Sequence, residues 1–399
     1  MLKIRKTSLW IALLVGLTMF LAACGADDPT PTATTAPPPA ADAPAADPFQ
    51  VEWDALIAAA QAEGTLEMFA CCTLGGNFKE FASRFKDKFG VQVNSFTGGS
   101  RDAREKIIPE RQAGIYSIDV WIGGSRGATS VLIPADMIDP IEPLLIHPEV
   151  LDDAAWLGGQ GPGFADSQQK FLIPYAGDGG FSTTVAYNTD AVDPAEFTSY
   201  YDLLDPKWKG RIIARDPRFT GIGDANFYLF HPLLGEDFLR RLITEMDIVF
   251  VDDARQATDQ LAKGAYDLCL FNCSQEVFAA RDQGLPVNVL QHVLKEGEDI
   301  GWGANVVWAM NKPPHPAAQK LFINFLLTRE GQIMFQDITG SDSLRIDIPK
   351  DSVKPDLLRH PGVEYLRFDQ IVPGWLTAEI QIAGITFAKE LMGEPEAKQ

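Results

Sequence analysis

The chain has 399 residues, of which 46% are hydrophobic and 22% charged, a composition typical of a globular protein. With 54 acidic against 34 basic residues, its formal net charge is −20. A surface this acidic repels phosphate backbones and anionic headgroups, which excludes nucleic acid and acidic lipid surfaces as partners. It places no restriction on a small ligand, which responds to the charges of its own pocket.

The amino terminus has the form of an export signal that ends in a lipid-attachment motif. Lys3, Arg5 and Lys6 precede an uncharged run over residues 9–23, which is too short to cross a bilayer comfortably. The run ends in Leu21-Ala22-Ala23-Cys24, which resembles the lipobox of bacterial lipoproteins. We therefore expect a signal peptide over residues 1–23 and an acylated Cys24 as the mature N-terminus. An ordinary secretory signal and an uncleaved anchor are the alternatives.

Residues 24–48 are almost entirely Pro, Ala, Thr and Asp, with no aromatic side chain and no aliphatic one larger than alanine. Such a segment cannot bury a core and stays semi-extended, so we expect a disordered tether. The protein would then lie in the cell envelope, lipid-anchored to the outer face of the cytoplasmic membrane or in the periplasm. The body that follows has about 350 residues, which predicts two domains.

The body opens with alternating helix and strand patterns. Apolar residues at helical spacing end at Gly64, and the amphipathic stripe of Phe78, Phe81 and Phe85 marks a second helix. Between and after these helices we expect strands over 65–73, 91–97 and 118–122, with a helix over 103–113. This order predicts a parallel sheet with right-handed crossovers, whose ligands lie beyond the carboxyl ends of the strands.

A second alternating block follows. We expect strands over 180–188, 211–215, 248–251, 266–271, 287–294 and 305–310. The helical patterns lie at 225–230, 238–244, 256–263 and 316–328, the last with one apolar stripe.

Short strings spread along this body resemble those of the bacterial extracellular solute-binding proteins of the type II periplasmic fold, in the ferric-iron, polyamine and phosphonate branch. They are Leu56-Ile57-Ala58-Ala59-Ala60-Gln61-Ala62-Glu63-Gly64, Glu110-Arg111-Gln112-Ala113-Gly114, Asp119-Val120, Val185-Ala186-Tyr187-Asn188-Thr189, Tyr201-Asp202-Leu203-Leu204-Asp205-Pro206-Lys207-Trp208-Lys209-Gly210-Arg211-Ile212, His315-Pro316-Ala317-Ala318 and Glu330-Gly331-Gln332. The string that begins at Tyr201 is the most specific.

The resemblance implies an α/β fold of two lobes, each a mostly parallel sheet flanked by helices. Residues 49–172 with 303–399 would form the first lobe and 173–302 an inserted second lobe, joined by two crossing strands. A small solute would bind between the lobes, and hinge closure would present it to an ABC permease. It further implies a monomer without cofactor, metal or catalytic residue.

Carried over by position, the solute contacts come from the loops that follow the strands. They are Cys72, Thr73, Ser100, Arg101, Ser125 and Arg126 in the first lobe, Arg218, Thr220, Asn272 and Ser274 in the inserted lobe, and Asp178 and Trp302 near the hinges. Glycine-flanked loops that open onto helix amino termini, with three arginines among them, favour an anionic solute. For each arginine the alternative is a solvated or structural salt bridge.

Ferric iron is the rival cargo, but it needs neighbouring tyrosines in the binding loops. Tyr200-Tyr201 lies at the expected start of a surface helix, so we interpret this pair as structural. A serine or thiol hydrolase is the alternative of another class, because Gly123-Gly124-Ser125-Arg126-Gly127 matches a nucleophile elbow and Cys72 lies in a binding loop. Against it, four of the five histidines precede proline.

Besides Cys24, the chain has the four cysteines Cys71, Cys72, Cys269 and Cys273, which allow three pairings. A bond between neighbours is strained, and a bond between Cys72 and Cys273 would lock the two lobes together. Free buried cysteines and a soft-metal site stay open as further possibilities.

Overall fold

The computed structural model describes residues 47–71, 74–159, 161–177, 185–219, 225–271, 273–375 and 377–395. The expected signal peptide, Cys24 and nearly all of the expected tether lie outside these residues. From Asp47 onward the chain belongs to one unit. Among the described helices, none combines the length and apolar character needed to cross a membrane.

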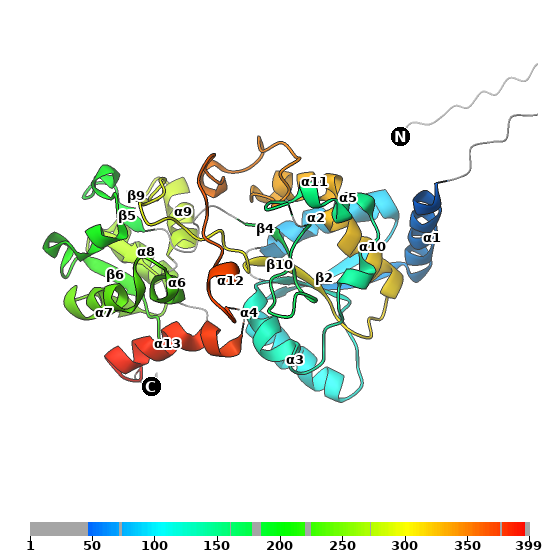
Figure 1. Cartoon of the computed structure of the whole chain (residues 1–399), viewed down its shortest axis with the longest axis horizontal. Coiled ribbons are helices and arrows are strands. Elements are labelled where there is room, and N and C mark those ends of the chain that lie inside the picture. The colour runs from blue at the N-terminus through cyan, green and yellow to red at the C-terminus, as the bar shows by residue number, and fades with distance from the viewer. Residues whose placement is uncertain are drawn as a thin grey trace, which may run out of the picture. The chain divides into compact units, whose positions relative to one another are not determined.

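The first sheet has the strand order β2-β1-β3-β10-β4. Figure 1 labels β2, β10 and β4 of this sheet. β1 (Thr65–Cys71) pairs in parallel with β2 (Gln92–Gly98) and β3 (Val120–Gly123). β10 (Asn305–Ala309) runs antiparallel between β3 and β4 (Ile173–Ala176). Four strands therefore share one direction and β10 alone opposes them, as the mostly parallel prediction requires.

The second sheet repeats this pattern with the order β7-β6-β8-β5-β9. β6 (Ile212–Arg215) pairs in parallel with β7 (Val249–Val251) and β8 (Leu268–Leu270). β5 (Ala186–Asn188) runs antiparallel between β8 and β9 (Val287–Val289). The opposing strand is thus the one by which the chain enters the second sheet, just as β10 is the one by which it returns to the first.

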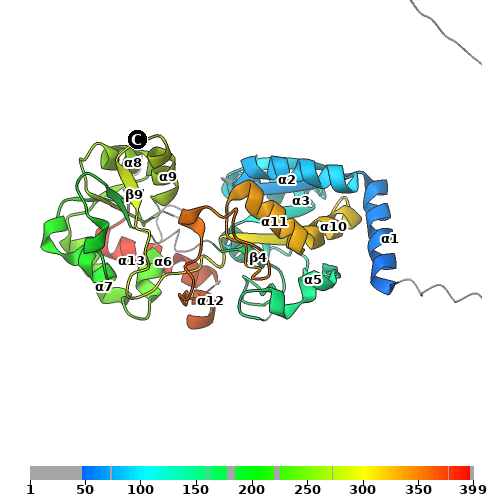
Figure 2. The same cartoon turned by 90° about the horizontal axis from the view of Figure 1, so that it is seen from above.

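Seven helices among the described residues accompany the first sheet. They are α1 (Pro48–Glu63), α2 (Leu74–Phe89), α3 (Ser100–Gln112), α4 (Ser125–Gly127), which continues into the π-helical turn η1 (Ala128–Leu132), α5 (Pro148–Leu151), α10 (Pro316–Leu327) and α11 (Arg329–Thr339). The predicted phenylalanine stripe of α2 packs on α10, with ring centroids 5.2 Å apart between Phe85 and Phe322. α10 and α11 lie beside α2 in both views (Figure 2). We call the buried apolar side chains of this sheet and its helices the first core.

The second sheet carries α6 (Ala225–Phe230), α7 (Gly235–Glu245), α8 (Ala254–Ala262), α9 (Ser274–Asp282), α12 (Phe368–Ile371) and α13 (Ala378–Met392). Short 3-10 turns complete the chain: η2 (Glu142–Leu144), η3 (Asp153–Ala155), η4 (Pro194–Glu196), η5 (Tyr200–Leu204), η6 (Pro206–Trp208) and η7 (Pro355–Leu357). The buried side chains on both faces of this sheet form what we call the second core.

Two segments pack differently from the expected assignment to lobes. The strand Ile173–Ala176, expected to open the inserted lobe, pairs with β10 in the first sheet. The carboxyl-terminal helix, expected with the first lobe, buries Phe387 and Ala388 in the second core. Asn226 fixes it there, because the amide of Gly384 donates to the Asn226 Oδ1 atom at 2.7 Å.

Besides the two expected crossing strands, the chain runs between the cores a third time, over residues 359–368, which we call the third passage. Arg359 binds the end of β4, whereas Phe368 is buried in the second core. Between them, the amide of Leu366 donates to the carbonyl of Glu298 at 2.7 Å, so this passage lies along the segment that leads into β10.

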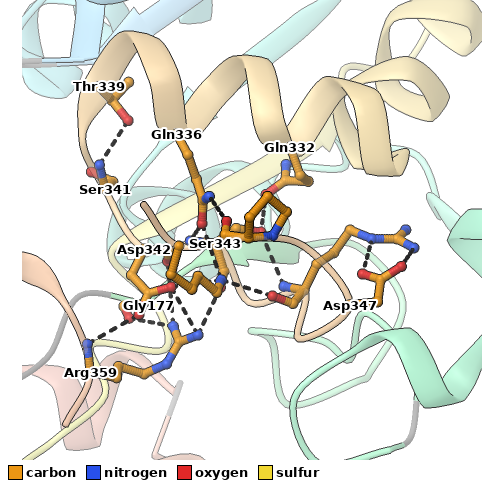
Figure 3. A network of polar contacts seen from close by, with 12 residues as sticks. Gly177, Gln332, Gln336, Thr339, Ser341, Asp342, Ser343, Asp347 and Arg359 are labelled. Carbon is orange, nitrogen blue, oxygen red and sulfur yellow. Dashed lines mark hydrogen bonds and ion pairs between the residues drawn. The ribbon is translucent and has the colours of Figure 1, made fainter. Parts of the chain in front are cut away.

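A buried polar network holds the carboxyl end of β4 (Figure 3). Asp342, 1% exposed, binds the Lys350 ammonium at 2.8 Å and the Arg359 guanidinium at 3.1 Å. Arg359 also donates to the carbonyl of Gly177 at 2.8 Å. Burial lowers the pKa of Lys350, and the carboxylate of Asp342 opposes that shift. The network therefore fixes residue 177, where β4 ends.

Candidate functional site

The ends of three strands converge at what we call the carboxyl edge of the first sheet, where β1, β2 and β3 end. A Cβ atom built on Gly123 would lie 2.9 Å from the Cβ atom of Cys71 and 3.7 Å from the Ser100 hydroxyl oxygen. Glycine is therefore needed at position 123 for this close approach. The arrangement brings the predicted solute residue Ser100 next to the ends of β1 and β3.

Two helices start at this edge behind glycines. Gly99 precedes α3 and Gly124 precedes α4, and neither start has a side-chain cap. The amide of Ser125 donates to the carbonyl of Gly303 at 2.8 Å, and the residue is only 5% exposed. Helix starts without side-chain caps present backbone donors and a positive dipole end, which suits an anion.

Arg126 follows Ser125 and is half-buried. Its carbonyl accepts a hydrogen bond of 2.6 Å from the Ser130 hydroxyl, which holds the turn into η1. Arg104, which the sequence reasoning missed, reaches the same turn from α3, since a Cβ atom on Gly127 would lie 3.1 Å from its guanidinium carbon. The spacing of four residues from Ser100 to Arg104 on one helix was the signal that could have found it.

At the matching edge of the second sheet, Arg218 is part of an ion pair. Its guanidinium binds Asp216 through two nitrogens, at 3.0 Å from Nε and 2.6 Å from Nη2, and donates to the carbonyl of Gly393 at 3.2 Å. The Asp216 carboxylate raises the pKa of Arg218. The structural salt bridge considered from the sequence is thus present, and the contact of Arg218 with a solute stays a prediction.

Arg215, at the end of β6, was also missed. Burial lowers the pKa of its guanidinium, and the nearby charges of Asp253 and Glu276 oppose that shift. These carboxylates belong to the starts of α8 and α9. Cations at this edge are therefore accompanied by anions of the chain itself.

The β8–α9 turn contains a disulfide between Cys269 and Cys273. Cys71, at the end of β1, is disulfide-bonded as well. For these three cysteines the free-thiol and soft-metal possibilities are wrong, because their sulfur atoms are in disulfides. Cys72 lies outside the described residues.

Trp302, expected near a hinge, is buried among Phe164, Arg367 and Gly163, and its contact with a solute stays a prediction. It is 5% exposed, and its indole N–H donates to the carbonyl of Phe164 at 2.8 Å. The guanidinium of Arg367 lies 3.1 Å from the ring centroid. On another side Gly163 approaches so closely that a Cβ atom there would lie 2.7 Å from the ring.

Other predicted solute residues cannot be placed. Thr73, Asp178, Thr220 and Asn272 lie outside the described residues, as does Cys72. Arg101 and Ser274 belong to the first turns of α3 and α9, but their side chains are not among those described.

The two rival functions, iron binding and serine hydrolysis, would each depend on particular side chains. No group of three or more His, Cys, Asp or Glu side chains there could hold a metal ion. Tyr200 is buried in the second core at the start of η5, and the Tyr201 hydroxyl donates to the carbonyl of Leu233 at 3.1 Å, so the tyrosine pair is structural as expected. His315, one of the histidines that precede proline, binds Asp119 and Thr65 at 2.9 and 3.0 Å.

Solved structures share this fold at low sequence identity. Iron-bound HitA from Pseudomonas aeruginosa is 19% identical with a TM-score of 0.55, covering 82% of this chain and 99% of its own. FutA (IdiA) from Trichodesmium, with iron and citrate, is 16% identical with a TM-score of 0.59, covering 82% and 99%. AfuA from Actinobacillus pleuropneumoniae, with exogenous fructose-6-phosphate, is 18% identical with a TM-score of 0.57, covering 82% and 98%.

No curated protein matches the sequence. A family model does, over residues 66–337, which is more than half of the chain. This match spans both sheets and every strand of the fold, from β1 to β10. The chain belongs to the bacterial extracellular solute-binding proteins.

Proposed function

We propose that this protein captures a small anionic solute between its two sheets and delivers it to the permease of an ABC importer. The observation that carries the proposal is the carboxyl edge of the first sheet. There Ser100 and Ser125 open helices that start behind glycines without side-chain caps, and Arg126 follows within one turn. Backbone donors, hydroxyls and a cation together form an environment that favours carboxylate or phosphate groups.

The ligands of similar proteins support this solute class. AfuA was solved with a sugar phosphate, and FutA with iron and citrate. Ferric iron is the second candidate, because iron-bound HitA has the same fold. Since Tyr200 is buried in the second core and the Tyr201 hydroxyl binds the carbonyl of Leu233, we propose that any iron would arrive as a complex with an organic anion.

The remaining parts of the proposal concern where and how the protein works. Acylated Cys24 would anchor a monomer at the cell envelope, with residues 24–48 as the spacer. The solute would favour a closed arrangement of the two cores over an open one, since a ligand with equal affinity for both would shift nothing. The ion-paired second edge would serve as the closing surface, with Thr220, Asn272 and Ser274 as its proposed contacts and Asp178 near the hinge.

Thermal-shift and calorimetric titration of residues 24–399 carrying Cys24→Ser would test the proposal. The panel contains inorganic phosphate, methylphosphonate, fructose 6-phosphate, citrate, spermidine and ferric citrate. We expect saturable stabilisation by an anion of this panel, about 2.7 kcal/mol at a concentration of 100 times Kd. Stabilisation by spermidine alone, or a coloured complex with bare ferric iron, would contradict the anionic solute.

Substitutions would locate the site. Arg126→Ala is expected to weaken the stabilising anion at least tenfold without changing the folding transition. Arg84→Ala is the matched control, because Arg84 pairs with Glu80 on the exposed face of α2. Turnover of any panel compound that stops in Ser125→Ala would favour the hydrolase instead.

A further inference from the structure

The second edge contains two neighbouring helices that begin in different ways. α8 starts with Asp253, whose carboxylate accepts a hydrogen bond of 2.8 Å from the amide of Gln256. α9 starts with Cys273, which makes no side-chain capping bond. Aspartate is among the best capping residues, whereas cysteine is not one of them. The start of α9 therefore lacks the local hydrogen bond that fixes the start of α8.

The turn before α9 has an unfavourable backbone. Phe271 adopts φ +58°, a left-handed conformation that residues other than glycine rarely adopt. Its side chain is nevertheless buried in the second core, edge-on to Tyr228 with ring centroids 5.6 Å apart. Strained backbone of this kind persists only where the surroundings hold it in place.

The disulfide supplies that restraint. Cys269 lies in β8, where it is paired with Ala186 on one side and Ile213 on the other, so its position is fixed by the sheet. Cys273 is the cap residue of α9, and both cysteines are almost fully buried. The bond closes a short loop that contains Phe271, and it joins β8 in the sheet to the cap residue of α9.

We propose that the Cys269–Cys273 disulfide is a positioning element of the solute site, which holds the amino-terminal turn of α9 against the second sheet in place of a capping side chain. The inference rests on the proposed function, because α9 starts at the edge that would close over the solute. The disulfide does not itself contact the solute. It fixes where the backbone donors of α9 point.

The test compares the double variant Cys269→Ser, Cys273→Ser with Val289→Ala, in residues 24–399 carrying Cys24→Ser. Val289 is buried in the same part of the second core, on β9, and its substitution removes volume there while leaving the disulfide in place. Hydrogen exchange is followed at the Val277 amide, which donates to the Cys273 carbonyl at 3.2 Å in the first bonded turn of α9. Amides of β6 report on the sheet.

We expect the double variant to exchange at Val277 at least tenfold faster while β6 is unchanged. Its affinity for the panel anion that stabilises the parent, fructose 6-phosphate or inorganic phosphate first, should fall at least tenfold. Val289→Ala should change neither in this selective way. Unchanged exchange and affinity in the double variant, or an equal loss in Val289→Ala, would overturn the proposal.

Reduction gives an independent arm. A water-soluble phosphine transfers two electrons to the disulfide, takes an oxygen atom from water to become the phosphine oxide, and leaves the two protons on two thiols. The reduced parent should match the double variant at Val277. Phosphine added to the double variant isolates the contribution of the Cys71 disulfide. If no anion binds the parent, the proposed function fails, whereas the exchange at Val277 still decides whether the disulfide holds the turn.

Discussion

The two sheets have the same pattern of strand directions, but their carboxyl edges differ in how their polar groups are satisfied. At the first edge, α3 and α4 start behind glycines without side-chain caps. At the second edge, Asp216 binds Arg218, Asp253 caps α8 and a disulfide holds the start of α9. The same pattern of strand directions is therefore compatible with different polar groups at the two edges. The first edge has donors to offer a guest, while the second mainly stabilises itself.

The largest expected effect concerns the network that supports the first edge. Asp342→Ala leaves Lys350 and Arg359 without their shared carboxylate in a buried site, so the free energy of unfolding should fall by about 3–5 kcal/mol. Chemical denaturation measures the change. Asp342→Asn, which keeps the shape and one acceptor, should lose less. An equally stable Asp342→Ala protein would mean that this network does not support β4.

The next effect concerns Glu298, in the segment between the two sheets. Burial raises the pKa of its carboxyl to about 7, and neighbouring Asp299 adds to the shift. Because the folded form holds this proton more tightly than the unfolded form, the stabilisation is complete below about pH 4 and is lost as pH rises through 7. Denaturation midpoints between pH 5 and 8 should fall with pH.

Glu298→Gln should flatten that part of the stability profile, because glutamine cannot ionise. Glu364→Gln is the control, since Glu364 lies exposed on the nearby third passage. A slope that is the same in the parent and in Glu298→Gln would assign the pH dependence to other groups.

A glycine pair tests the close approach at the first edge. Gly123→Ala places a methyl group 2.9 Å from the Cys71 Cβ atom, so overpacking should cost about 1–3 kcal/mol and weaken solute binding. Gly98→Ala, at the end of the neighbouring strand, meets nothing within 4 Å and should be nearly neutral. Thermal unfolding and titration of the same anion compare the two. Similar losses in both variants would argue against convergence at position 123.

At the second edge, Arg218→Ala should act mainly on stability. The change leaves buried Asp216 without its cation, and we expect a loss of about 1–3 kcal/mol. Affinity for the anion should change less than in Arg126→Ala, measured by calorimetry. The reverse order would mean that the second edge, and not the first, anchors the solute.

The smallest effect concerns an ion pair between α9 and the turn η7. Arg281 of α9 binds Asp356 of η7 through two nitrogens, at 2.8 and 2.7 Å. Both side chains are partly exposed, so a double-mutant cycle with Arg281→Ala and Asp356→Ala should give a coupling of roughly 0.5–1 kcal/mol. The cycle is measured by denaturation at low and high salt. A coupling that does not weaken with salt would show that packing, and not charge, joins these groups.

Much of the fold follows from periodicity. Strand and helix patterns up to residue 328 correspond to observed elements, and the glycines at positions 99 and 124 mark where helices open. Those signals are local, since they depend on side-chain alternation and on backbone freedom within a few residues. The preference for an anion that we propose for the first edge rests on the same local signals.

Contacts between residues far apart in the sequence could not be predicted from local patterns. The carboxyl-terminal helix has an apolar stripe that fits either core, and only Asn226 and its close contact with Gly384 show which one it covers. Trp302 is surrounded by Gly163, Phe164 and Arg367, and no local pattern in the sequence indicates these partners. Arg218 is the exception, because its partner stands two residues earlier in the chain.

The placement of β10 has a consequence for how the chain acquires its structure. All five strands of the second sheet come from one continuous stretch, residues 186–289. The first sheet must instead recruit β10 from residues 305–309 into its interior, between β3 and β4. Closing so long a loop is entropically slow, so the amino-terminal strands wait, incompletely paired, until the middle of the protein has folded. The first sheet, which contains the amino-terminal strands, is thus completed after the second sheet.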